Sequence, residues 1–116
     1  MLVVDDQESF REVLRDLVAA TKGFTLVGDA ASGEAALEAV AELSPNMVIL
    51  DKRMPGMGGI EAARVLTARH PHVVVVLASV EEMDPELLGS CRRAAIVRKQ
   101  QLTTTKLREL WRDHGI

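Results

Sequence analysis

The sequence predicts a doubly wound α/β fold, in which helices cover both faces of a five-stranded parallel sheet. Short apolar runs alternate with amphipathic stretches along all 116 residues, with no repeat or linker between them. Residues 73–77 (VVVVL) are apolar without alternation, which indicates a strand that is covered on both faces. A chain of this length, 47% hydrophobic, can form one core but not two. Five strand–helix units of this size therefore favour one parallel sheet.

The first half of the chain contains three expected strands, at residues 2–4, 24–27 and 47–50. Apolar side chains at helical spacing predict a helix after the first strand, and Gly23 helps to end it. Its expected stripe consists of Phe10, Val13, Leu14, Leu17 and Val18. Ser32 is the expected N-cap of a second helix that ends before Pro45. The apolar side chains of that helix are Ala36, Leu37, Val40 and Ala41.

The second half continues the alternation. A helix is expected at residues 60–69 and a strand at residues 73–77. Asp84 followed by Pro85 is typical of a helix start, and that helix would run through Leu87, Leu88 and Cys91. A fifth strand is expected at residues 95–97, before a final helix from about Thr104 that carries Leu107, Leu110 and Trp111.

Three carboxylates follow two of these strands. In doubly wound sheets the ligand site lies beyond the carboxyl ends of the strands, where the strand order reverses. If the order is 2-1-3-4-5, strands one and three flank that point, and they end at Asp5-Asp6 and at Asp51. Clustered carboxylates repel one another unless a cation lies between them, and Mg²⁺ prefers a few carboxylate oxygens. The acidic cluster is therefore a candidate magnesium site at which a carboxylate could accept a phosphoryl group.

Two further strand ends supply groups that suit phosphoryl chemistry. Ser79 follows the fourth strand and offers a hydroxyl, and Lys99 follows the fifth and offers a positive charge. Each residue alone is more often a turn or surface residue. The joint placement of acids, hydroxyl and lysine at one edge of the sheet is what indicates a site.

Four segments carry a resemblance to a known family. They are VVDDQ, VILDKRMPGMGGIEA, VVVVLAS and AAIVRK, in this order along the whole chain. Together they resemble the receiver domain of bacterial two-component response regulators. Their sequences are similar to those of receivers that often precede a LuxR-type DNA-binding domain. The resemblance implies a flavodoxin-like (βα)5 fold and one receiver domain over residues 1–116, with no output domain in this chain.

The resemblance also implies a role for each site residue. Asp51 would accept a phosphoryl group from a sensor histidine kinase or a phosphotransfer protein. Asp5, Asp6, Asp51 and the main-chain carbonyl of Arg53 would hold Mg²⁺, with Asp6 binding directly and Asp5 through water. Ser79 and Lys99 would bind the phosphoryl oxygens. Phosphorylation would then switch the surface made by the helix after Asp84, the fifth strand and the final helix.

The chain departs from the family pattern at several positions. Ala78 and Ser79 compete for the hydroxyl position, and Ser79 is preferred because it lies 28 residues after Asp51 and can donate a hydrogen bond. Gly58 replaces an Asp that resembles a cap of the third helix. Ile96 replaces an aromatic residue that many receivers use for readout, and the helix after Asp84 is short, so both weaken the expectation of a switch.

Arg53 and Glu81 each lie two places past a proposed site residue. They are therefore expected to pair across the mouth of the site and to restrict the water that would attack the phosphoryl group. Two mobile surface charges are an equally good interpretation.

Charge and composition argue against nucleic-acid binding, an internal disulfide and a membrane span. Residues 1–86 contain 15 acids and 7 bases, and residues 87–116 contain 2 acids and 7 bases, so the net charge of −3 divides into −8 and +5. Tyr is absent and Phe occurs twice, which argues against nucleic-acid binding despite the basic end. The single cysteine excludes an internal disulfide. No membrane-spanning run is evident, so a cytoplasmic location is expected, and dimerisation through the final helix stays open.

Two other functions are compatible with parts of the sequence. A receiver-fold interaction module that acts without phosphorylation would be compatible with Ile96 and the short helix. A phosphatase with an aspartyl-phosphate intermediate would resemble an Asp-x-Asp arrangement, but Arg53 occupies the second acidic position. The chain is thus not expected to be an enzyme, except in its own phosphorylation and dephosphorylation.

Overall fold

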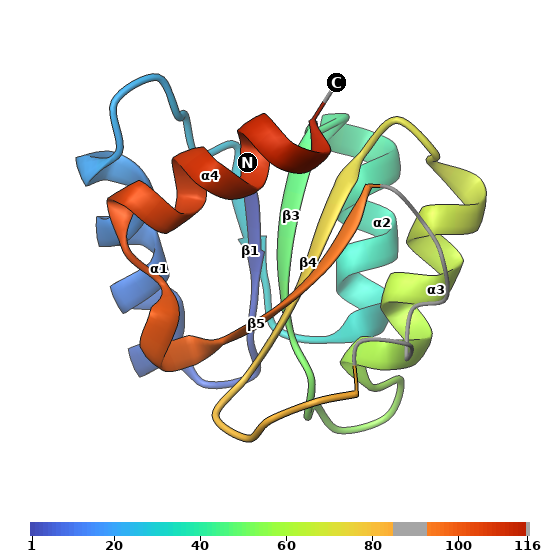
Figure 1. Ribbon diagram of the computed structural model, residues 1–116. Helices are drawn as coiled ribbons and strands as arrows, with labels where there is room; N and C mark the ends of the chain where they lie inside the picture. Colours follow the sequence, from blue (N-terminus) through green and yellow to red (C-terminus); the bar gives the residue numbers. More distant parts are fainter. Residues whose placement is uncertain (85–92, 116) are drawn as a thin grey trace.

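The computed structural model describes residues 1–84 and 93–115 and contains one parallel sheet. Its five strands have the order β2-β1-β3-β4-β5 (Figure 1). The strands are β1 (Leu2–Val4), β2 (Gly28–Ala30), β3 (Met47–Asp51), β4 (Val74–Ser79) and β5 (Ala94–Arg98). All four neighbouring pairs are parallel, so the predicted doubly wound fold is confirmed.

In the part of the chain that the structure describes, two pairs of helices cover the two faces of the sheet. The helices are α1 (Glu8–Ala20), α2 (Gly33–Leu43), α3 (Gly59–Arg69) and α4 (Thr104–His114), and a 3-10 turn, η2 (Lys99–Gln101), follows β5. In Figure 1, α1 and α4 lie on one face, and α2 and α3 on the other. Alternate strand residues accordingly enter two apolar clusters: Val48 and Leu50 pack toward α2 and α3, whereas Ile49 packs toward α1 and α4.

Most predicted elements have their expected positions. Ser32 caps α2, and its hydroxyl accepts a hydrogen bond from the Ala35 amide at 3.1 Å. Gly58 caps α3 without a side-chain hydrogen bond. The helix expected after Asp84-Pro85, which includes Cys91, falls outside the described residues.

The second strand was predicted too early in the chain. Residues 24–27 are not a strand, and β2 begins at Gly28, because the ladder with β1 pairs Leu2 with Gly28. A single bond from the Val27 amide to the Met1 carbonyl, at 2.9 Å, precedes that ladder. The prediction that Val13 belongs to the buried stripe of α1 is also wrong, because Val13 is 56% exposed. Leu14 and Val18, one turn apart, are its fully buried members. Ala41 of α2 is likewise exposed.

Strand register determines where the carboxyl ends lie. Leu50 pairs with both Val4 and Leu77, and Asp51 pairs with Ala78. Asp5, Asp51 and Ser79 therefore end neighbouring strands at one edge of the sheet, and β5 ends beside them at Arg98. Every residue of β4 is buried, so this edge is built on a rigid, fully covered strand.

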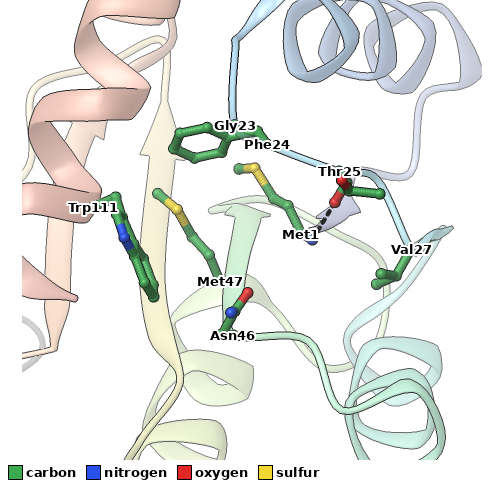
Figure 2. Close-up of a pocket in the computed structure, with 8 residues that line it drawn as sticks. All are labelled: Met1, Gly23, Phe24, Thr25, Val27, Asn46, Met47 and Trp111. Carbon is green, nitrogen blue, oxygen red and sulfur yellow. Dashed lines mark hydrogen bonds between the residues drawn. The ribbon is translucent and has the colours of Figure 1, made fainter. Parts of the chain in front are cut away.

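The opposite, amino-terminal edge of the sheet contains a cavity of about 280 Å³ (Figure 2). Met1, Phe24, Met47 and Trp111 line it, and the terminal ammonium of Met1 donates a hydrogen bond to the Thr25 carbonyl at 2.7 Å. Phe24 and Trp111 thus lie at the end of the sheet opposite the acidic cluster. Within residues 1–84 and 93–115, no helix is both long and apolar enough to cross a bilayer.

Candidate functional site

Three aspartates converge at the carboxyl edge of the sheet. One carboxylate oxygen from each of Asp5, Asp6 and Asp51 lies within 4.8 Å of the other two. Asp5 is buried, Asp51 is half-buried and Asp6 is exposed, so the cluster opens to solvent on the Asp6 side. Hard oxygen donors with one open side suit Mg²⁺, which binds a few carboxylates and keeps several waters. The donor set therefore fits the predicted metal.

Asp5 is held firmly from several directions. Its amide donates to the Ala30 carbonyl at 3.1 Å, and its Oδ1 accepts a hydrogen bond from the Gln7 amide at 2.9 Å. The Arg11 guanidinium donates to the Asp5 carbonyl at 2.7 Å and also pairs with Glu8. Only 1% of Asp5 is exposed. These bonds fix the loop between β1 and α1, so Asp5 presents its remaining oxygen, Oδ2, in a defined direction.

Lys99 joins two of the aspartates. Its Nζ lies 2.9 Å from Asp5 Oδ2 and 3.1 Å from Asp51 Oδ1, and its side chain is 13% exposed. Burial alone would lower the pKa of Lys99, but the hydrogen bonds to Asp5 and Asp51 outweigh it, and the pKa is raised. The ammonium thus stays charged beside the carboxylates and partly neutralises the cluster.

Burial raises the pKa of the Asp51 carboxyl above its ordinary value. The hydrogen bond from Lys99 opposes this shift, the negative charge of Asp5 adds to it, and the main-chain N–H of Arg53 opposes it further. Asp51 is therefore a carboxylate with few water contacts that has one cation beside it. With 12% of its side chain exposed, this carboxylate is less hydrated than that of a surface aspartate.

The segment between β3 and α3 packs closely against the phosphoacceptor candidate. A Cβ on Gly59 would overlap the Asp51 carbonyl oxygen and would lie 2.8 Å from the carbonyl carbon. The Gly59 amide also donates to the Lys52 carbonyl at 3.0 Å. From α2, Glu34 accepts a hydrogen bond from the Met57 amide at 3.3 Å. The first turn of α3 and the start of α2 thus fix the chain on both sides of Arg53.

Ser79 and Arg53 lie at the same edge. Ser79 is 4% exposed, and its hydroxyl oxygen accepts a hydrogen bond from the Glu81 amide at 3.1 Å, which leaves its proton available to a ligand. Ala78 instead packs in the apolar cluster beneath α1 and α4. The Arg53 guanidinium pairs with Glu81 at 2.9 Å, as the spacing predicts. The structure thus places all the predicted site residues at one sheet edge, with direct contacts between Lys99 and two of the aspartates.

Two contacts of the site were missed in the sequence. Phe10 was assigned only to the buried stripe of α1, yet the Lys99 ammonium lies 4.0 Å from the centroid of its ring. Arg11 was not assigned a role, although it holds the Asp5 carbonyl. Their position in the first turn after the Asp5-Asp6 pair was the available signal, because that turn begins where the carboxylates lie.

Comparison with known proteins identifies the family. The family model described as the response regulator receiver domain matches residues 1–98. The chain belongs to this family. Receiver domains act in phosphorylation-based two-component signalling, and the strand order, the acidic cluster and the lysine described above agree with that membership.

Individual relatives and solved structures agree with this family membership. Response regulator GacA from Pseudomonas viridiflava is 44% identical over 85 residues, which are 73% of this chain and 40% of that protein. The response regulator domain of Thermotoga maritima CheB superimposes with a TM-score of 0.79 at 28% identity, over 99% of this chain and 95% of that one. CheY in the CheX-CheY-BeF3-Mg²⁺ complex from Borrelia burgdorferi has a TM-score of 0.76 at 26% identity, over 94% and 83% of the chains. The chain thus spans less than half the length of the GacA protein that it matches.

Proposed function

We propose that Asp51 of this receiver accepts a phosphoryl group from the phosphohistidine of a sensor histidine kinase or phosphotransfer protein. The observation that carries the proposal is the contact of one half-buried ammonium, Lys99, with both Asp5 and Asp51 inside a three-carboxylate cluster. A structural ion pair would not need the third carboxylate. A site for a divalent cation and a phosphoryl group would use all four groups.

The chemistry assigned to Asp51 is a displacement at phosphorus. Its carboxylate oxygen forms a bond to phosphorus while the bond from phosphorus to the imidazole nitrogen breaks, and the nitrogen keeps the electron pair. The product is an acyl phosphate. Lys99 already lies 3.1 Å from the attacking carboxylate, so it can follow the negative charge onto the phosphoryl oxygens. Ser79, whose proton is available, is proposed as a further donor to those oxygens.

Asp6, Asp51 and the Arg53 carbonyl are proposed as direct Mg²⁺ ligands, with Asp5 acting through water. When bound, the cation supplies neutralisation of the phosphoryl charge. Asp5 suits an outer role, because Gln7 and Lys99 already engage its two oxygens. The exposed Asp6 suits a direct one. The beryllofluoride and magnesium named in the CheY complex support this assignment by homology.

Phosphorylation is proposed to change the surface that β5 and α4 form, together with the segment after Ser79. Ile96 of β5 packs against the apolar cluster beneath α2 and α3, so movement near Ser79 can reach β5 through the core. We further infer a cytoplasmic receiver of residues 1–116, without enzymatic activity beyond its own phosphorylation and dephosphorylation. Dimerisation of the chain through α4 is proposed as well.

The proposal is tested with Mg²⁺ and acetyl phosphate as the small phosphodonor, followed by intact-mass measurement. Wild type should gain the mass of one phosphoryl group, and Asp51→Asn should gain none. Asp16→Asn is the matched control, because it makes the same chemical change on the exposed side of α1. An unmodified wild type would favour the phosphorylation-independent interaction module, and an equal adduct on Asp51→Asn would place the acceptor elsewhere.

A further inference from the structure

Phe10 provides a contact that the family resemblance does not account for. It lies in the first turn of α1, and its half-buried ring packs against the apolar cluster beneath α1 and α4. The ring centroid is 4.0 Å from the Lys99 nitrogen, within the range of a cation–π interaction. Lys99 is the first residue of η2, directly after β5, so the contact joins the first helix to the segment that follows the last strand.

Among the described residues, three partners contact the Lys99 ammonium. They are Asp5 Oδ2 at 2.9 Å, Asp51 Oδ1 at 3.1 Å and the Phe10 ring. With 13% of the side chain exposed, little water remains to hydrate the charge. A dehydrated ammonium gains more from an aromatic face than an exposed one does.

The three partners differ in what the proposed reaction does to them. Asp51 becomes the acyl phosphate and so loses its present contact, whereas Asp5, proposed to act on Mg²⁺ only through water, can keep its oxygen on Lys99. The ring of Phe10 is uncharged and takes no part in the reaction. It can therefore help to hold the ammonium at the reacting edge while the contact with Asp51 changes.

We propose that Phe10 is a positioning residue for phosphorylation, whose aromatic face keeps Lys99 directed at the phosphoryl group. This inference rests on the proposed function. It distinguishes an aromatic face from mere apolar bulk, because leucine would fill much of the same space without a π system. Phe10→Tyr keeps the face, whereas Phe10→Leu removes it.

The chain offers a matched control in its only other phenylalanine. Phe24 packs against the same apolar cluster but lines the cavity at the opposite edge of the sheet (Figure 2). Phe24→Leu deletes the same atoms without touching the site. Any loss that reflects general loosening of the core should appear in both leucine variants.

Two measurements test the role. In metal-free protein, the side-chain proton resonances of Lys99 nearest the ammonium should show an upfield ring-current shift. That shift should persist in Phe10→Tyr and Phe24→Leu and should vanish in Phe10→Leu. With acetyl phosphate, Phe10→Leu should be phosphorylated about three- to tenfold more slowly than wild type, and Phe10→Tyr within about twofold of it. The deficit should persist at saturating Mg²⁺, because the acidic cluster itself is unchanged.

The outcomes separate this inference from the function on which it rests. If wild type is phosphorylated, and Phe10→Leu matches Phe24→Leu in rate or recovers fully at high Mg²⁺, the positioning role is wrong while the proposed function stands. Absence of the ring-current shift in wild type would also overturn the role. A wild type that forms no adduct would overturn both.

Discussion

A single methyl group on Gly59 should displace the strand end that carries Asp51. The Cβ of Gly59→Ala would overlap the Asp51 carbonyl oxygen and would lie 2.8 Å from the carbonyl carbon and 2.9 Å from the Lys52 Cα. All three are backbone atoms at the end of β3, so no flexible side chain can move aside to relieve the clash. Either β3 or the first turn of α3 must shift.

The expected magnitude follows from two opposing effects. Overpacking of this kind costs about 1–3 kcal/mol. Alanine is the better helix former, which returns up to about 1 kcal/mol. Because the overlap is with three backbone atoms, the cost should lie in the upper part of that range, about 2–3 kcal/mol, and Gly59→Ala should lower the free energy of unfolding by about 1–3 kcal/mol. The rate of Asp51 phosphorylation should also fall. The fall should exceed what the loss of folded protein explains, because the shift displaces Asp51 itself.

The neighbouring glycine is the control. A Cβ on Gly58 would meet only the Lys52 carbonyl oxygen, at an ordinary contact distance of 3.6 Å. Gly58→Ser should leave stability unchanged or raise it by a few tenths of a kcal/mol, because serine is a better N-cap than glycine. Urea unfolding of the metal-free proteins measures both variants. Equal stability of Gly59→Ala and wild type would refute the claim that this close approach fixes the end of β3.

Three further predictions concern the charges of the site. Mg²⁺ at a hundred times its dissociation constant should stabilise wild type and Asp16→Asn by about 2.7 kcal/mol in urea unfolding; the same stabilisation in Asp6→Asn would contradict the metal assignment. Arg53→Ala and Glu81→Ala should each shorten the lifetime of the phosphorylated form by about two- to fivefold, because their ion pair shields the mouth of the site from water. Unchanged dephosphorylation rates would show that the pair is a plain surface contact. Burial raises the pKa of Asp51 in the folded protein above its value in the unfolded chain, so the folded state binds that proton more tightly. Metal-free wild type should therefore lose stability relative to Asp51→Asn as pH rises between the two pKa values, and an opposite slope across a pH series would contradict the cause assigned to the shift.

The carboxyl edge of the sheet was predictable because chemistry and topology coincide there. Buried apolar runs end at Asp5, Asp51 and Ser79, and parallel strands bring such ends together whatever lies between them. Lys99 followed from the same reasoning, since it comes directly after β5. These predictions needed only the ends of strands.

The remaining errors concern features that only packing decides. Residues 24–27 have the composition of a strand, but the ladder register with β1 begins at Gly28. Val13 has helical spacing but lies at the margin of the stripe, where solvent reaches it. The role of Phe10 was missed because no sequence pattern indicates that Lys99, which follows β5, comes to lie over its ring.

The central claim is that Asp51 carries the phosphoryl group, and borohydride trapping tests it most directly. Borohydride reduces an aspartyl phosphate to homoserine, and peptide mass spectrometry then locates the reduced residue. After incubation with Mg²⁺ and acetyl phosphate, homoserine should appear at position 51 and should be absent when the phosphodonor is omitted. Homoserine at another aspartate, or none in a protein that has gained the phosphoryl mass, would contradict the assignment.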